Sequence, residues 1–335
     1  MNSYTFPLCL LPDEAQLQVI RSLDYLQLIS LSLISTKAKA LVESFRMKIS
    51  RLMVVVAKDS LSITVTYRND SEFLEFKIYH EAMEPGGPLI SLNKITNCIY
   101  TRTRLPGDEP NLYLTWHNPG LSFNQFFHHL QSLLKIDQNC VEFNAEHEVF
   151  DTVAIRKLLP EWYSMSIEEA FGEYPQKICE LFSPCSKAFF MFTFEQLQLQ
   201  FPQKIAINNF DDFDFHDPLS LDDLLVSNAV DIGVGDFSLS DTNRFLKSWI
   251  RGSNPRLRKI TIYLEREEGQ GEVEADKNVL LKGIKHQVMP EDLERATNYS
   301  IITGGFDIRN KRGIPATIEI RSGHLTLVNF HIWDW

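Results

Sequence analysis

Positive charge, cysteine and long apolar runs are all scarce in this sequence. Its 335 residues include 33 Lys and Arg against 44 Asp and Glu, which gives a formal net charge of −11 at pH 7. An acidic balance disfavours nucleic acid and anionic membrane surfaces as partners. The five cysteines form no C-x-x-C pair, which favours reduced thiols in a cytoplasmic and/or nuclear protein over a disulfide framework.

The N-terminal residues lack the features of a targeting or membrane segment. No Lys or Arg precedes Arg21, and Pro7 and Pro12 interrupt the apolar residues at the start. A signal peptide needs a basic start and an unbroken apolar stretch. The uncharged stretch 25–36 is too short to span a bilayer. We therefore expect the many leucines near the N-terminus to serve a soluble fold or a soluble partner.

The sequence also lacks the motifs of the common enzyme and metal sites. No G-x-S-x-G, H-E-x-x-H or P-loop pattern occurs. Neighbours on a helix point about 100° apart, so His128 and His129 are expected to be solvated side chains rather than a metal pair. The turn 233–236 lacks the third glycine of a dinucleotide fingerprint, and the acidic loop 211–218 lacks the glycine and glutamate of a calcium loop. The sequence predicts no catalytic, metal or cofactor site, although its many carboxylates leave an unrecognised acid–base pair open.

Helical periodicity is what residues 12–45 do show, in three short segments. Pro12 suits the first turn of one helix, Asp24 has a capping-box partner in Gln27, and Ser35 can cap a third helix. The apolar face expected for the third helix consists of Ile34, Ala38, Leu41, Val42 and Phe45. Three such helices bury too little to be robust alone. The surplus leucines serve either a partner or the rest of this chain, and the pattern favours neither.

The segment FPLCLLPDEAQLQVIRSLDYLQLISLSLISTKAKALV, residues 6–42, closely resembles an F-box. The similarity rests on the Phe-Pro-Leu entry, on Leu11-Pro12 opening the first helix and on Leu23-Asp24 between helices. The resemblance implies docking to the Skp adaptor of a cullin–RING ubiquitin ligase. The residues expected to form the adaptor-facing surface are Leu8, Leu10, Leu11, Pro12, Ile20, Leu23, Leu26, Ile29 and Leu31. The sequence does not divide them between that surface and the module's own core.

From Leu52 the pattern changes to short runs rich in β-branched and aromatic residues, separated by turn signals. It predicts a small antiparallel sheet over 51–117. Beyond residue 120 helix and strand patterns alternate. Strands are expected near 140, 187, 203, 230 and 257. Helices are expected over 121–136, 152–162 and 290–296, and two more are expected to follow caps at Ser220 and Ser240. The last strands are spaced by roughly 27 residues, within the range of leucine-rich repeats. A degenerate stacked β/α array is expected, and one open α/β domain is the alternative.

Residues 219–262 look like the F-box-associated domain of type 2, found in a large nematode F-box family, and the strongest match is NRFLKSWIRGSNPRL, residues 243–257. The resemblance implies a target-binding role but transfers no binding residues. We expect an α+β or α/β chain with a three-helix F-box over 1–49, a small β-rich region over 50–118 and a leucine-rich-repeat-like F-box-associated domain over 119–335.

The sequence thus predicts a non-catalytic substrate receptor that binds a Skp-family adaptor, and through it a cullin–RING ligase, together with an unknown target protein. Three alternatives remain open. The chain could act with the adaptor outside a ligase, be an enzyme with an unrecognised site in the α/β region, or bind nothing. A deep pocket with convergent titratable groups would favour the enzyme.

Overall fold

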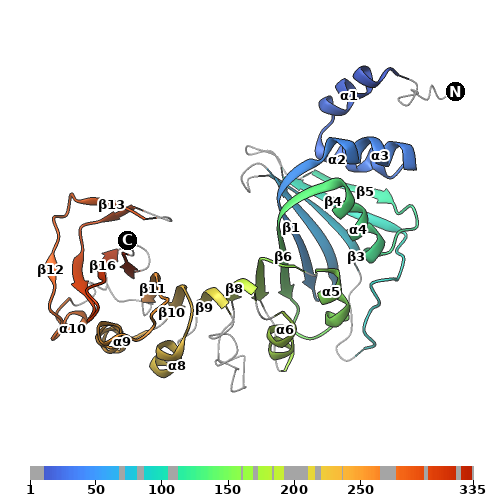
Figure 1. The fold of residues 1–335 in the computed structure, drawn as a ribbon. Coiled ribbons are helices and arrows are strands. Elements are labelled where there is room, and N and C mark those ends of the chain that lie inside the picture. The colour runs from blue at the N-terminus through green and yellow to red at the C-terminus, as the bar shows by residue number, and fades with distance from the viewer. Residues whose placement is uncertain are drawn as a thin grey trace. The chain divides into compact units, whose positions relative to one another are not determined.

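The computed structural model divides the chain into two compact units, Met1–Trp162 and Tyr163–Trp335, and we describe each unit by itself (Figure 1). The residues that the structure describes are 11–67, 72–80, 87–104, 112–159, 161–168, 173–182, 185–191, 210–215, 220–235, 237–264, 277–297, 301–321 and 326–333. Strands expected near 203 and the charged loop expected at 265–276 lie outside them.

Unit 1 begins with the three helices that the sequence predicts. They are α1 (Asp13–Ser22), α2 (Tyr25–Ser32) and α3 (Thr36–Phe45). The predicted capping box is confirmed, since the Asp24 carboxylate accepts from the Gln27 backbone N–H at 2.7 Å and the Gln27 side chain accepts from the Asp24 N–H at 3.0 Å. Ser35 caps α3 by accepting from the Ala38 N–H at 3.2 Å. Local sequence therefore defines where these helices begin.

A six-stranded sheet in the order β6-β1-β2-β3-β4-β5 forms the body of unit 1. Its strands are β1 (Met47–Ala57), β2 (Ser60–Tyr67), β3 (Glu72–His80), β4 (Cys98–Arg104), β5 (Leu112–His117) and β6 (Leu134–Asn144). β1 to β5 confirm the predicted antiparallel sheet, because each pairs antiparallel with the next. β6 returns to pair in parallel with β1. The predicted boundaries of the three domains are not tested by this arrangement and stay predictions.

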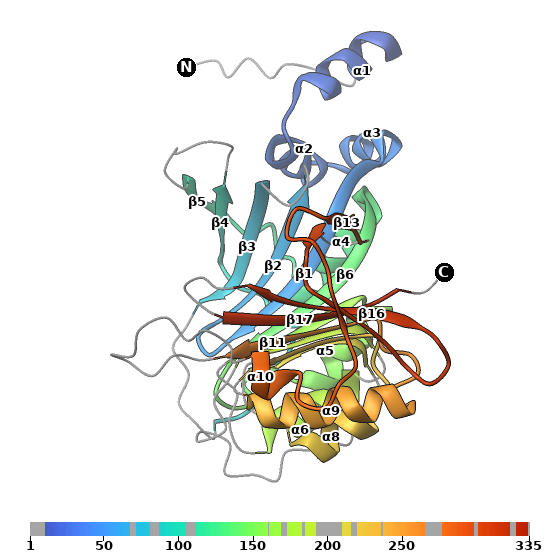
Figure 2. The same ribbon diagram turned by 90° about the vertical axis from the view of Figure 1, so that its left-hand side faces the viewer.

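Two further helices belong to unit 1, α4 (Phe123–Leu133) and α5 (Thr152–Leu158). α4 supplies the centre of the core, since Phe123, Phe126 and Phe127 are completely buried. The Phe126 ring meets the Phe76 ring of β3 edge-on, with ring centroids 5.3 Å apart. Figures 1 and 2 show α2 and α3 at one end of the strands, with α1 farther from the sheet.

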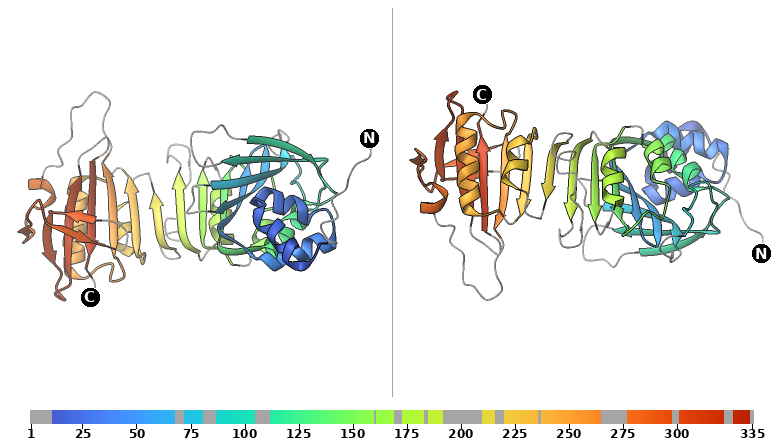
Figure 3. Two further views of the ribbon diagram at one scale, coloured as in Figure 1. Left: turned by 90° about the horizontal axis from the view of Figure 1, so that it is seen from above. Right: turned by 90° about the horizontal axis from the view of Figure 1, so that it is seen from below.

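Unit 2 contains five neighbouring parallel strands followed by antiparallel ones. The parallel strands are β7 (Ser164–Glu168), β8 (Cys185–Met191), β9 (Phe210–Phe215), β10 (Asp231–Gly235) and β11 (Lys259–Leu264). Between them the structure describes the helices α6 (Tyr174–Phe182), α8 (Leu221–Val226) and α9 (Leu239–Arg251). α8 and α9 lie on the same side of these strands (Figure 3, right). Each helix therefore covers the strands beside it, as in other β/α arrangements.

The C-terminal elements continue the sheet of unit 2 beyond β11 and add a small hairpin. They are α10 (Lys277–Leu280), β12 (Gln287–Val288), β13 (Glu294–Ala296), β14 (Ile301–Thr303), β15 (Phe306–Arg309), β16 (Pro315–Arg321) and β17 (Thr326–Ile332). β17 pairs antiparallel with β11, and β16, β15 and β12 follow in order, while β13 and β14 form a separate hairpin. The chain is thus α+β, with an N-terminal helical region and mixed β-sheet.

Three local predictions are wrong, each because long-range pairing or a competing cap decides the outcome. Residues 211–215 are not an acidic loop but part of β9, where Asp212 forms a 2.6 Å ion pair with Lys187 of β8. The helix predicted over 290–296 is absent, and Glu294–Ala296 pairs as β13 with β14. Ser238, not Ser240, caps α9, because its hydroxyl both accepts from the Asp241 N–H and donates to the Asp241 carboxylate.

Candidate docking surface of the N-terminal helices

The residues predicted to face an adaptor divide between the interior of unit 1 and its surface. Ile20 and Ile29 are 0% exposed, so they belong to the core of the helical module in this conformation. Of the others that the structure describes, Pro12 is exposed, and the partly exposed ones are Leu11, Leu23, Leu26 and Leu31. Leu8 and Leu10 lie outside the described residues. No finding tests the adaptor-facing role itself, which stays a prediction.

The most exposed large apolar side chain among the described residues of the helical module is Ile34, which the sequence assigned to the apolar face of the third helix. Ile34 is 75% exposed because it lies in the turn before the cap of α3, where helical periodicity does not apply. Phe45, in the last turn of α3, is 39% exposed, whereas Ala38 and Val42 are buried as predicted. The cap at Ser35 was the signal that excludes Ile34 from the helix. Leu17 of α1 is also exposed, at 37%.

On its inner side, α2 is held by specific contacts to the rest of unit 1. The Tyr25 hydroxyl donates to the Lys48 carbonyl at 2.8 Å. The Tyr25 ring stacks on the Tyr67 ring of β2, with centroids 4.3 Å apart and planes inclined by 19°. Ser32 and His129 of α4 share a 2.8 Å hydrogen bond between Oγ and Nε2. These contacts fix α2 against β1, β2 and α4, so unit 1 presents the opposite side of the helices outward.

His129 corrects the prediction that both histidines of the pair are solvated. Its neighbour His128 is exposed. His129 is half-buried on the side of α4 that meets Ser32 of α2. Burial, together with the nearby charge of Lys39, lowers the pKa of His129 to about 4, although Glu43 opposes the shift. The imidazole is therefore neutral in the folded chain at pH 7.

This pKa predicts an acid-sensitive junction between α4 and the N-terminal helices. The unfolded chain takes up a proton at His129 near pH 6.5, while the folded chain takes it up only near pH 4, so stability is lost as the pH falls between these values. With solvent screening of this half-exposed group, we expect a loss of about 1–2 kcal/mol. Hydrogen exchange of α2 and α4 at pH 7 and pH 4.5 measures it. His129→Gln should remove this pH dependence and His128→Gln should keep it; equal profiles in both variants would contradict the assignment.

The side chains of segment 243–257 in unit 2 make contacts within the fold. The Asn243 side chain donates to the carbonyls of Leu280 and Lys282 at 2.7 and 3.1 Å. The Asn254 side chain donates to the carbonyls of Leu224 and Ser227 at 2.8 and 2.9 Å. Phe245, Leu246 and Trp249 are buried, and Gly252 ends α9 as predicted, with φ 109°. The segment therefore fixes α9 to the residues around α8 and α10.

Titratable side chains gather on neighbouring parallel strands of unit 2. Asp212 lies opposite Asp231 in the register, and Lys259 Nζ lies 3.9 Å from the Asp231 carboxylate. Burial raises the pKa of Asp231 to about 6, with a further increase from Asp212 and a decrease from Lys259. Burial, with a contribution from Asp214, raises the pKa of Tyr263 to about 12. Within the described ranges, no group of three or more His, Cys, Asp or Glu residues could hold a metal ion.

The fold combines a small N-terminal helical module with an α+β body. Two family models match the chain, the F-box domain over residues 8–50 and the F-box associated domain over residues 201–262. The chain therefore carries an F-box followed by an F-box-associated domain, a pair typical of non-catalytic adaptor proteins. Comparisons with curated proteins and with solved structures gave no significant match. In the described part of the chain, no helix has the length and apolarity needed to cross a membrane.

Proposed function

We propose that this chain is the substrate receptor of a Skp–cullin–F-box ubiquitin ligase, located in the cytoplasm and/or the nucleus. The observation that carries the proposal is the F-box match over 8–50. It falls on helices whose inner side is held by unit 1 and whose connecting turn exposes Ile34. An apolar side chain that is 75% exposed on a small docking module is suited to burial by a partner.

The proposed mechanism is proximity. The F-box holds a Skp-family adaptor, and the adaptor connects the chain to a cullin–RING enzyme carrying ubiquitin. A target protein held by the same chain then presents a lysine at high effective concentration to the ubiquitin thioester. No residue of this chain takes part in the chemistry.

The target is proposed to bind the F-box-associated part of the chain. The family match over 201–262 supports this role. The succession β9-α8-β10-α9-β11, with parallel neighbouring strands, supports the further proposal of a degenerate, leucine-rich-repeat-like stacked β/α array. Such arrays leave one face of the strands free of helices, and that face is commonly the binding surface.

Co-expression with a Skp adaptor followed by size-exclusion chromatography tests the adaptor interface. Ile34→Glu places a charge where an apolar contact is proposed, and should weaken binding at least about tenfold, or about 1.4 kcal/mol, without affecting folding. Ile95→Glu is the matched control, because Ile95 is 55% exposed in the same unit but outside the helices. The natural chain and Ile95→Glu should co-elute with the adaptor. A natural chain that stays monodisperse and ignores the adaptor would refute the proposed function.

A further inference from the structure

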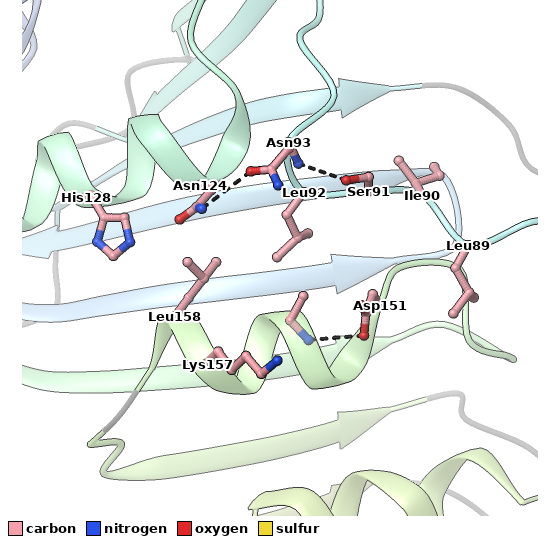
Figure 4. Close-up of a pocket in the computed structure, with 11 residues that line it drawn as sticks. Leu89, Ile90, Ser91, Leu92, Asn93, Asn124, His128, Asp151, Lys157 and Leu158 are labelled. Carbon is pink, nitrogen blue, oxygen red and sulfur yellow. Dashed lines mark hydrogen bonds between the residues drawn. The ribbon is translucent and has the colours of Figure 1, made fainter.

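Unit 1 contains a cavity of about 430 Å³ between the segment 89–93 and the helices α4 and α5 (Figure 4). This volume falls within the range of small binding sites. Three largely buried side chains, Ile90, Leu92 and Leu158, contribute apolar surface, and Leu89 adds an apolar side chain that is 47% exposed. Most of the apolar contact area that a partner would find here therefore belongs to Leu89.

Two asparagine side chains lie across the cavity from α5 (Figure 4). The Asn124 side-chain N–H donates to the side-chain oxygen of Asn93 over a long distance of 3.4 Å. The Asn124 side-chain oxygen is buried and has no hydrogen-bond partner among the described residues. That oxygen is closed to a ligand, whereas the Asn93 side chain is exposed and its amide N–H groups can donate to one. A side-chain amide offers one acceptor and an N–H donor, which match the N–H and C=O of a peptide group.

Within the described segments, the cavity lining contains one cationic side chain, Lys157, and one carboxylate, Asp151. Lys157 lines the cavity, is exposed and forms no ion pair with any residue that the structure describes. The one carboxylate in the lining, Asp151, is engaged at the start of α5, where it accepts from the Val153 and Ala154 N–H groups at 3.0 and 3.1 Å. Its charge is thus stabilised by the helix terminus, whereas the Lys157 ammonium remains free to pair with a carboxylate.

We propose that this cavity binds an extended peptide segment of the target in which an apolar residue stands next to an acidic one. The apolar side chain packs on Leu89 and on the accessible edges of Ile90, Leu92 and Leu158. A backbone carbonyl accepts from the Asn93 amide, and the carboxylate pairs with Lys157. The inference rests on the proposed function and adds a second contact with the target, on unit 1. Two linked contacts raise the overall affinity above that of either one.

Other occupants fit less well. A basic peptide would place a cation beside Lys157. A second copy of this chain would bring another net charge of −11 and would need a much larger apolar interface than this cavity offers.

The test is selection of random heptapeptides displayed on phage against the purified full chain, followed by affinity measurements on a synthetic peptide of the enriched sequence. We expect enrichment of an apolar residue adjacent to Asp or Glu. Lys157→Glu should weaken binding of that peptide at least tenfold, and a peptide with lysine in place of the acidic residue should regain affinity for Lys157→Glu. Lys135→Glu, a charge reversal at another exposed lysine of unit 1, should bind like the natural chain.

No enrichment, enrichment of peptides without an acidic residue, or equal affinity for the natural chain and Lys157→Glu would each overturn the proposal. Adaptor co-elution is scored on the same preparations. A natural chain that binds the adaptor but enriches no peptide counts against this cavity alone, and a natural chain that binds the peptide but not the adaptor counts against the proposed function alone.

Discussion

Replacing Asn254 by aspartate is expected to lower the free energy of unfolding of unit 2 by about 4 kcal/mol. Asn254 is 4% exposed, and its side-chain N–H groups donate to two backbone carbonyls, those of Leu224 and Ser227. Aspartate has the same shape but no donor, so a buried carboxylate would face two carbonyl oxygens. Native-state hydrogen exchange of the β10 and β11 amides measures the loss.

Asn254→Gly separates the side-chain effect from the backbone effect. Asn254 has a φ of 51°, a left-handed conformation that glycine adopts freely and that asparagine and aspartate tolerate. The glycine variant should lose about 2 kcal/mol, for two missing hydrogen bonds without a buried charge. Exchange in unit 1 serves as the internal reference and should not change. An aspartate variant as stable as the glycine variant would show that the carbonyls do not repel the carboxylate as argued.

Phe126→Ala is expected to destabilise unit 1 by about 3–5 kcal/mol, because it opens a cavity in the centre of the core. The Phe126 side chain is 0% exposed and lies edge-on to Phe76, whose ring also lies 5.8 Å from that of Trp116. The substitution therefore removes the contact between α4 and β3. Urea unfolding followed by hydrogen exchange of β3 and α4 gives the change.

Phe126→Leu is the matched control for cavity size and should cost about 1–2 kcal/mol, since leucine refills part of the volume. His128→Ala, at an exposed site of the same helix, should change stability by less than about 0.5 kcal/mol. If the alanine and leucine variants at residue 126 were equally stable, α4 would not be the centre of the core that the structure shows.

The elements that could be predicted from the sequence are those set by local chemistry. Asp24 with Gln27, and Ser35, cap their helices as the spacing indicates, because a cap needs only the backbone N–H groups two or three residues away. Gly252 ends α9 for a similarly local reason. The alternating strands before residue 117 were predicted because turn signals separate them and each pairs with the next.

The errors concern residues whose partners lie far along the chain. The aspartates at 211, 212 and 214 favour a loop when the sequence is considered alone, but Lys187 of the neighbouring strand forms an ion pair with Asp212 and the segment is a strand. Glu294–Ala296 has helical residues but forms a strand because β14 supplies the pairing and Arg295 bonds to Asp307 at 2.9 and 3.0 Å. The helical pattern alone predicts a solvated side chain at His129. In the fold, Ser32, which is distant in sequence, forms a hydrogen bond with it.

By itself, the sequence determined the helical module at the N-terminus, the order of its caps and the presence of an F-box and an F-box-associated domain, since motif spacing and capping are short-range properties. Only the tertiary structure decided which apolar residues of that module are buried and which, like Ile34, remain exposed. The tertiary structure also places segment 89–93, α4 and α5 around one cavity, which no sequence pattern indicated. The reason is physical: burial and cavities depend on which distant segments pack together, and no spacing along the chain records that packing.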